Sequence, residues 1–434
     1  MNILKLTSTL LICNVFIACG NSSTGSESGE SSMVLSSSLE PESSSSVDFS
    51  SSSMEVETSA WHTFTPDNPA IHIVGRGDYT TPLAPTFAWS GSNWSIAFHG
   101  TAVKILLTAP GSIFNVFVDG DTIPTSVLDL SNSSEGEHLL AENLTEGEHT
   151  ITVFKRTEAQ YGNATFQGFK VYGYSTLSSF PTITRRIEFI GNSITCGYGD
   201  LDSLKENTFD ITTEDHYWTY AATTARHLGA ESHAICYSGR GLYRNNTGSL
   251  NGTLPELFPT ISPSTTIAWD FSQWIPEVLV INLGTNDFYL GIPDSSEFVT
   301  AGITFIKSIR SYYPTTKILM LDGPMLSDYY PAATLSDFSQ FPEEPIKGYP
   351  SAYIMRRISG TDTSYTYRSQ TVCQRYLNAI KNNLLSSGET NVARYSFPAQ
   401  TGKYGYGADW HPSKAQHAYM AGLLEGWVKT EMGW

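Results

Sequence analysis

The chain has 434 residues, of which 40% are hydrophobic, 12% aromatic and only 15% charged. This length exceeds what one average domain requires, and the composition is typical of a folded protein with a neutral polar surface. The formal net charge of −17 argues against a nucleic-acid partner, because a phosphate backbone requires a basic surface.

Residues 1–19 have the features of a signal peptide. Lys5 supplies a positive start, and the apolar stretch from Leu6 to Ala18 is too short to span a bilayer. Cys19 follows a small residue, which resembles the end of a bacterial lipoprotein signal and predicts that Cys19 becomes lipidated. The alternative is an ordinary secretory peptide in which this cysteine is only apolar filler.

A linker is predicted over residues 20–58. Runs of serine alternate there with acidic residues, and large apolar side chains are scarce. Such a segment cannot bury enough surface to offset its ordering entropy, so we expect it to be extended and disordered. Together, this linker and the lipid on Cys19 predict a secreted protein that is anchored to the bacterial cell surface or outer membrane. We expect no membrane contact other than the lipid anchor.

Residues 59–180 are predicted to form a β-sandwich or jelly roll. Short runs there alternate apolar and polar side chains and are separated by turn residues, which is the signature of antiparallel strands. The predicted strands include 94–100, 103–107, 115–120, 149–155 and 166–172.

Residues 181–434 are predicted to form an α/β domain, a parallel sheet with helices on both faces. Compact apolar runs, typical of strands buried on both faces, occur at 187–190, 278–281 and 317–321. Helices are predicted over 217–228, 298–311 and 413–429.

Ser193 follows the first of these apolar runs. In parallel α/β folds ligands bind at the carboxyl ends of the strands, so residues just beyond each run are candidates for a site. A serine on a glycine-flanked turn between strand and helix is exposed and suits a nucleophile. The alternative is that Ser193 only caps the following helix.

Gly239 and Asn286 are candidates for stabilising a developing negative charge. Gly239 follows the run 234–237, and a glycine lets a backbone N–H approach a ligand closely. Asn286 follows the run 278–283 and offers a neutral amide donor. An ordinary turn and an Asx turn are the respective alternatives.

His411 is the candidate base. It lies just before the last predicted helix, and Asp409 precedes it by two positions. A serine needs a base during attack, and the base needs a partner that fixes its tautomer. Trp410, between them, could stack on a sugar ring or pack in the core.

The order Ser, Gly, Asn, His at strand ends resembles the SGNH (GDSL-like) hydrolases. The resemblance implies that Ser193 is the nucleophile and first oxyanion donor, that Gly239 and Asn286 complete the oxyanion hole, and that His411 is the general base. Two departures concern Asn192, where the superfamily usually has Asp, and Ala408, which stands where the carboxylate usually lies. Asp409 is therefore expected either to complete a triad or to be dispensable in a Ser-His dyad.

More narrowly, the chain is similar to carbohydrate esterase family 2, in which a jelly roll precedes an SGNH domain. The motifs that carry this similarity are Val74-Gly75-Arg76, Trp89–Ser92, Phe98–Thr101, Val118–Gly120, His149-Thr150, Lys155–Glu158 and Gly191–Gly199. The resemblance implies removal of O-acetyl groups from xylan or glucomannan, with a tendency toward the 6-position. Acetylated polysaccharide is the expected partner, and no metal or other cofactor is expected.

Two alternatives to this function remain open. One is an SGNH esterase for another acylated glycan, such as peptidoglycan or an exopolysaccharide. The other is a non-catalytic glycan-binding surface protein.

Cys196, Cys236 and Cys373 are too few for a disulfide scaffold. A Cys196–Cys236 bond is possible, but buried free thiols are the favoured expectation.

Overall fold

The computed structural model describes residues 60–132, 136–175, 183–328 and 369–434, together with Phe180 and the strand segments 355–359 and 362–367. These residues belong to one compact unit, Glu55–Trp434. The predicted signal peptide, the lipidated Cys19 and the linker lie outside the described residues, so they stay predictions. None of the helices in the described part of the chain is long and apolar enough to cross a membrane.

The first part of the chain forms an antiparallel sheet of ten strands, in which the path β3-β4-β10-β5-β9-β6-β7 is joined by β1, β2 and β8. The strands are β1 (Trp61–Phe64), β2 (Ile71–Val74), β3 (Gly77–Asp78), β4 (Thr86–Phe87), β5 (Asn93–Thr108), β6 (Ser112–Val118), β7 (Ser126–Leu130), β8 (Glu137–Ala141), β9 (Glu148–Lys155) and β10 (Ala164–Ser175). They close over one apolar core that includes Trp94, Phe114 and Phe166.

The strands predicted at 94–100 and 103–107 are one continuous strand, β5, of 16 residues. Its first half pairs with β2 and β9, and its second half pairs with β8 and β10. Gly100 allows the close approach at the junction, because a Cβ atom there would lie 2.1 Å from the carbonyl oxygen of Tyr172. The sequence predicted two strands separated by residues 101 and 102, whereas the strand runs through Gly100 without a break.

The second part contains a parallel sheet of five strands in the order β12-β11-β13-β14-β17. The strands are β11 (Arg185–Gly191), β12 (Ala230–Cys236), β13 (Val278–Asn282), β14 (Lys317–Asp322) and β17 (Val392–Ser396). The predicted α/β fold is therefore confirmed.

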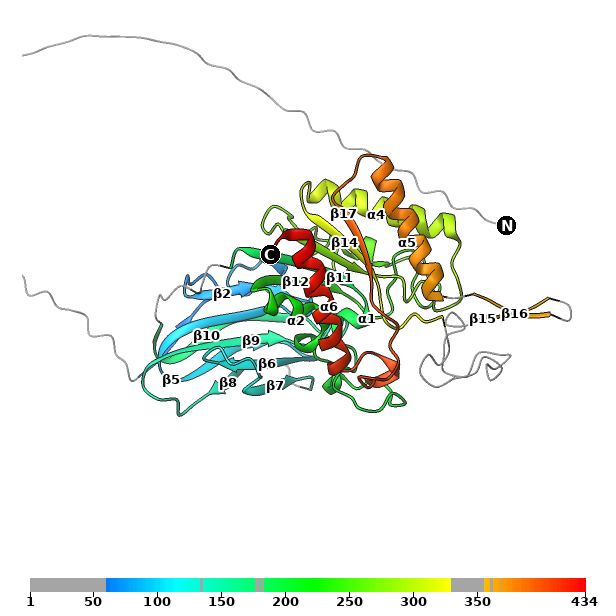
Figure 1. Ribbon diagram of the computed structural model, residues 1–434. Coiled ribbons are helices and arrows are strands. Elements are labelled where there is room, and N and C mark those ends of the chain that lie inside the picture. Colours follow the sequence, from blue (N-terminus) through cyan, green and yellow to red (C-terminus); the bar gives the residue numbers. More distant parts are fainter. Residues whose placement is uncertain are drawn as a thin grey trace, which may run out of the picture. The chain divides into compact units, whose positions relative to one another are not determined.

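Helices cover both faces of this sheet (Figure 1). α2 (Tyr220–His227) and α6 (Lys414–Met432) share one core with Ile187 and Phe189 of β11. α4 (Ser295–Tyr312) and α5 (Ser369–Ser386) share the core on the other face, which includes Ile190. Because strand side chains alternate between faces, one strand contributes to both cores.

The shorter elements are α1 (Ser193–Cys196), η1 (Ile211–Thr213), η2 (His216–Trp218), α3 (Leu254–Leu257), η4 (Ala408–Trp410) and the hairpin β15 (Met355–Ser359) with β16 (Asp362–Tyr367). The helix predicted from Tyr217 begins instead at Tyr220, because the side chain of Thr219 caps it by accepting from the N–H of Ala222.

Polar contacts join the antiparallel sheet to the parallel-sheet part. Arg76 donates to the Glu188 carboxylate at 2.8 Å, and both side chains are fully buried. Asn115 donates to Asp215 at 2.9 Å. Both contacts are between residues about 100 or more positions apart in the chain. The boundary predicted near residue 180 falls between β10 and β11 and remains a prediction.

Candidate active site

Ser193 lies at the start of α1, directly beyond β11, and is only 8% exposed. The cap of this helix is Asn192, whose side chain accepts from the N–H of Ile194 at 3.1 Å. The hydroxyl of Ser193 is therefore not used as a helix cap.

The hydroxyl of Ser193 meets the imidazole of His411 across 218 positions of sequence. His411 Nε2 lies 2.9 Å from Ser193 Oγ. His411 Nδ1 lies 3.2 Å from the carbonyl oxygen of Ala408. Since a carbonyl can only accept, this contact requires the hydrogen on Nδ1, which leaves the Nε2 lone pair to accept from the serine. The pair has the geometry of a nucleophile and its general base.

Among the described residues, the side-chain carboxylate of Asp409 does not hydrogen-bond to the imidazole nitrogens of His411. Its carboxylate accepts from the hydroxyl of Tyr198 at 2.7 Å. The ring of Tyr198 lies against that of His411, with centroids 4.2 Å apart. The geometry thus gives the tautomer-fixing role to the main chain of Ala408, and Asp409 reaches the histidine through Tyr198. A direct catalytic role for Asp409 is left without a supporting contact.

The backbone around Asp409 is unusual. Asp409 and Trp410 both have positive φ, at 47° and 57°. Each such residue costs on the order of 1–3 kcal/mol, so the surrounding structure must hold the turn. The N–H of Asp409 donates to Asn207 O at 3.0 Å, and Gln400 donates to Trp410 O at 2.5 Å. These contacts fix the loop that carries His411.

Loss of hydration lowers the pKa of His411 to about 4, although the Ala408 carbonyl and Asp409 oppose this shift. The imidazole is therefore neutral at physiological pH. A neutral imidazole is the form that can accept the serine proton.

Gly239 and Asn286 follow the two strands that flank β11. Gly191 of β11 pairs in register with Cys236 of β12 and with Asn282 of β13, so the three strands end at one level. The segments that carry Ser193, Gly239 and Asn286 consequently leave the same edge of the sheet. This is the arrangement that an oxyanion hole requires.

Asn286 and Asp287 hold the loop that follows β12. Asn286 Nδ2 donates to the carbonyl of Arg240 at 2.8 Å, which uses one of its two amide hydrogens. The buried carboxylate of Asp287 accepts from the N–H groups of Leu242, Tyr243 and Arg244 at 2.6–2.9 Å. Burial raises the pKa of Asp287 to about 6. The segment Gly284–Asp287 therefore supplies a candidate oxyanion donor, Asn286, and a carboxylate, Asp287, that fixes the loop after β12.

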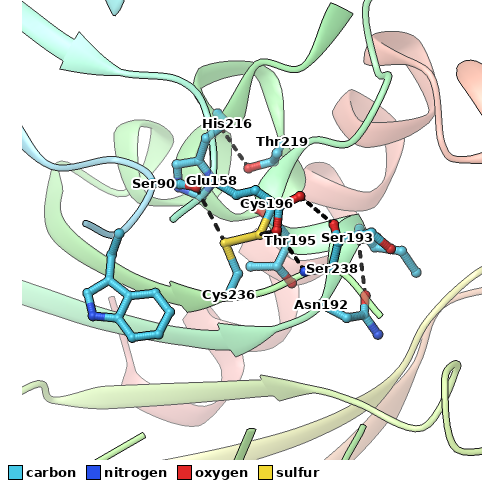
Figure 2. Close-up of a disulfide and its surroundings, with 12 residues drawn as sticks. Ser90, Glu158, Asn192, Ser193, Thr195, Cys196, His216, Thr219, Cys236 and Ser238 are labelled. Atoms are coloured by element: carbon cyan, nitrogen blue, oxygen red, sulfur yellow. Dashed lines mark hydrogen bonds between the residues drawn. A yellow bond between two sulfur atoms is a disulfide. The ribbon is translucent and has the colours of Figure 1, made fainter. Parts of the chain in front are cut away.

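Cys196 and Cys236 form a disulfide, with a Cα–Cα distance of 5.6 Å (Figure 2). The expectation of two buried free thiols was wrong. The parallel register that pairs Gly191 with Cys236 brings α1 beside the end of β12, and this proximity cannot be read from local sequence. Cys373 is free and buried.

Sequence reasoning missed three contributors to the site. The Ala408 carbonyl replaces a side chain and has no residue signature. Tyr198 lies inside the motif Gly191–Gly199. The glycines on either side of Tyr198 were a signal that another part of the chain approaches the main chain closely there. Asp287 directly follows Asn286.

Trp410 is half-buried beside His411, and its proposed contact with a sugar stays a prediction.

Two family models match the chain. The model described as "Carbohydrate esterase 2 N-terminal" matches residues 73–181. The model of the "GDSL-like Lipase/Acylhydrolase family" matches residues 189–419. Together they cover most of both sheets and every candidate catalytic residue.

Curated relatives agree with these matches. A cellulase/esterase, CelE, of Acetivibrio thermocellus is 36% identical over 369 residues, which are 85% of this chain and 40% of that protein. The chain thus spans less than half the length of that relative. An acetylxylan esterase / glucomannan deacetylase of Cellvibrio japonicus is 24% identical, with 87% of this chain and 93% of that protein covered.

A solved structure of a family two carbohydrate esterase from Clostridium thermocellum, in complex with cellohexaose, is 35% identical. Its TM-score is 0.71, and the match covers 84% of this chain and 99% of that one. A family two carbohydrate esterase from Cellvibrio japonicus, at 22% identity and the same TM-score of 0.71, shares the fold.

Proposed function

Because this chain belongs to carbohydrate esterase family 2, within the GDSL-like lipases and acylhydrolases, and is a carboxylic ester hydrolase, we propose that it removes O-acetyl groups from plant cell-wall polysaccharide. The proposed substrates are xylan and glucomannan, with a preference for acetyl at the primary 6-position of hexosyl units. The observation that carries this proposal is the 2.9 Å contact between His411 Nε2 and Ser193 Oγ.

The first half-reaction forms an acetyl-enzyme. His411 Nε2 takes the proton of Ser193 as Oγ bonds to the acetyl carbonyl carbon. The oxyanion that forms accepts from the N–H groups of Ser193 and Gly239 and from Nδ2 of Asn286. When this intermediate collapses, the bond to the sugar oxygen breaks and His411 returns its proton to that oxygen.

The second half-reaction releases acetate. His411 takes a proton from water, whose oxygen attacks the acetyl carbonyl, and the same donors hold the second oxyanion. Collapse breaks the bond to Ser193 Oγ, which regains its proton from His411. The Nδ1 contact with Ala408 keeps the imidazole in one tautomer through both steps.

Two features support a glycan substrate. The Cellvibrio japonicus relative is named for acetylxylan and glucomannan, and the Clostridium thermocellum structure holds cellohexaose. We also infer that Trp410 contacts a sugar ring. A Trp410→Ala variant should then raise KM for acetylated polymer and leave KM for a small aryl acetate unchanged.

We propose that the protein is secreted and held at the cell surface through a lipid on Cys19. The linker over 20–58 would then give the catalytic unit reach toward an insoluble polymer. A Cys19→Ala chain should appear in the soluble fraction of the producing cells. Recovery of this variant with the membranes would contradict the lipid anchor.

The substrate proposal is tested by acetate release from acetylated xylan, acetylated glucomannan and O-acetylated peptidoglycan under identical conditions. We expect release from the plant polymers. Release from peptidoglycan alone would move the function to another acylated glycan. Tight polymer binding without hydrolysis, even of an aryl acetate, would favour a non-catalytic binding protein.

A further inference from the structure

Glu158 is a buried carboxylate of the antiparallel-sheet part that reaches the catalytic loop. It ends the motif Lys155-Arg156-Thr157-Glu158, three residues beyond β9, and is fully buried. Its Oε2 accepts from the N–H of Ser238 at 2.7 Å, and its Oε1 accepts from the Ser238 hydroxyl at 2.6 Å. Both carboxylate oxygens thus hold one residue from a distant part of the chain.

Ser238 directly precedes Gly239. From this contact we propose that Glu158 is a positioning residue for acyl transfer, which holds the Ser238–Gly239 turn so that the Gly239 N–H faces the developing oxyanion. The inference rests on the proposed function, because it takes Gly239 as an oxyanion donor. It also gives the antiparallel-sheet part a role in the chemistry itself, beyond any role in polymer binding.

The backbone geometry explains why Ser238 is the residue to hold. The direction of the Gly239 N–H is set by the ψ angle of Ser238, and Gly239 itself has a φ of 77°, which favours glycine. On the far side, Asn246 N–H donates to Gly239 O at 2.9 Å, and Asn286 holds Arg240. Glu158 supplies the matching constraint on the near side of the glycine.

The same carboxylate contacts the segment that bears the nucleophile (Figure 2). Sγ of Cys196 lies 3.6 Å from Glu158 Oε2. Cys196 is three positions after Ser193, and its disulfide partner Cys236 is three positions before Gly239. Two separate connections, one through Glu158 and one through the disulfide, therefore link the segments that carry the two main-chain oxyanion donors, Ser193 and Gly239.

The surroundings of Glu158 show a built polar site. Gln160 Nε2 donates to Glu158 Oε1 at 2.7 Å. The N–H of Glu158 donates to Glu214 Oε2 at 3.0 Å, and buried Lys155 donates to the carbonyl of Thr157 at 2.7 Å. A cluster of buried ionisable groups stabilises an interface poorly compared with apolar packing. This comparison favours a role in positioning over a role in stability alone.

The test compares Glu158→Ala with Glu158→Gln in the full chain, using 4-nitrophenyl acetate as substrate. Loss of one oxyanion donor costs about 10²–10³ in turnover, so we expect misplacement of Gly239 in Glu158→Ala to lower kcat by about 10–100-fold with KM little changed. Glu158→Gln should stay within about five-fold of wild type, because its amide can accept from Ser238 N–H and donate to the rotatable Ser238 hydroxyl. The Gln160 amide can rotate so that its oxygen, instead of Nε2, faces the new NH₂ group.

A second readout separates positioning from folding. A trifluoromethyl ketone forms a tetrahedral oxyanion adduct with the serine, so its Ki should rise in Glu158→Ala by the factor that kcat falls. Glu188→Gln is the matched control, since Glu188 is also a fully buried carboxylate at the interface and bonds Arg76. We expect a lower melting temperature for Glu188→Gln but an unchanged kcat.

Wild-type kcat in folded Glu158→Ala, or an equal loss of kcat in Glu188→Gln, would overturn the inference. If Glu158→Ala does not fold, Ser238→Ala decides, because it removes the hydroxyl half of the clamp and should lower kcat several-fold. Wild-type kcat in Ser238→Ala would then overturn the inference. An inactive wild-type protein would instead refute the proposed function.

Discussion

The Nδ1 atom of His411 lies 3.2 Å from the carbonyl oxygen of Ala408. A main-chain carbonyl thus stands where a carboxylate usually orients the catalytic imidazole. It fixes the tautomer as a carboxylate would, but adds no full charge against the imidazolium that forms during attack.

This geometry predicts that Asp409→Asn has a small effect. In a Ser-His-Asp triad the equivalent change lowers kcat by about 10⁴. Here the Asp409 carboxylate accepts from Tyr198, so we expect less than about a ten-fold loss of kcat/KM on an acetyl ester. Tyr198→Phe should behave similarly. A loss of 10³ or more in Asp409→Asn would restore a direct triad role.

Asn286→Ala should be folded and severely impaired. The variant removes the side-chain donor of the proposed oxyanion hole, for which a cost of about 10²–10³ in turnover is expected. Circular dichroism and melting temperature provide the control, because Asn286 Nδ2 also holds the Arg240 carbonyl. Wild-type-like turnover would remove Asn286 from the oxyanion hole.

The enzyme should keep its activity to an unusually low pH on acidification. As the proposed general base, His411 can accept a proton only when neutral, and loss of hydration lowers its pKa to about 4. Activity is therefore expected to be independent of pH above about 5 and to fall as pH drops through about 4. The measurement is kcat/KM for an acetyl ester from about pH 3 to about pH 8, a range that includes both the predicted midpoint and the ordinary pKa of histidine. A midpoint near 6.5, the ordinary value for histidine, would contradict this environment.

Removal of the Cys196–Cys236 bond should destabilise the protein. The bond closes a loop with a sequence separation of 40, for which a contribution of about 2–4 kcal/mol to the free energy of unfolding is expected. Urea denaturation of Cys196→Ala/Cys236→Ala measures the loss, and Cys373→Ala is the control without a bond. Free thiols at positions 196 and 236, mapped in the unreduced protein, would contradict the pairing.

The sequence was sufficient to predict what local patterns encode. The apolar runs 187–190, 278–281 and 317–321 lie within β11, β13 and β14, and the helix predicted over 413–429 is α6, which Ser413 caps. β17 was not predicted. It is an edge strand, most of its residues are half-buried, and its sequence is partly polar, so it lacks the continuous apolar run of a central strand.

Contacts between distant segments could not be predicted. Ser193 and His411 were matched only through their motifs. Nothing local links Cys196 with Cys236, or Glu158 with Ser238 80 positions later. Every residue type has a main-chain carbonyl, so only the fold identifies that of Ala408 as the partner of His411.

The most direct test of the account is acetate release from acetylated glucomannan and xylan by the full chain, beside a Ser193→Ala variant of equal melting temperature. We predict release by the wild type and its loss in the variant, with polymer binding retained. Equal release by both proteins would contradict Ser193 as the nucleophile and, with it, the proposed mechanism.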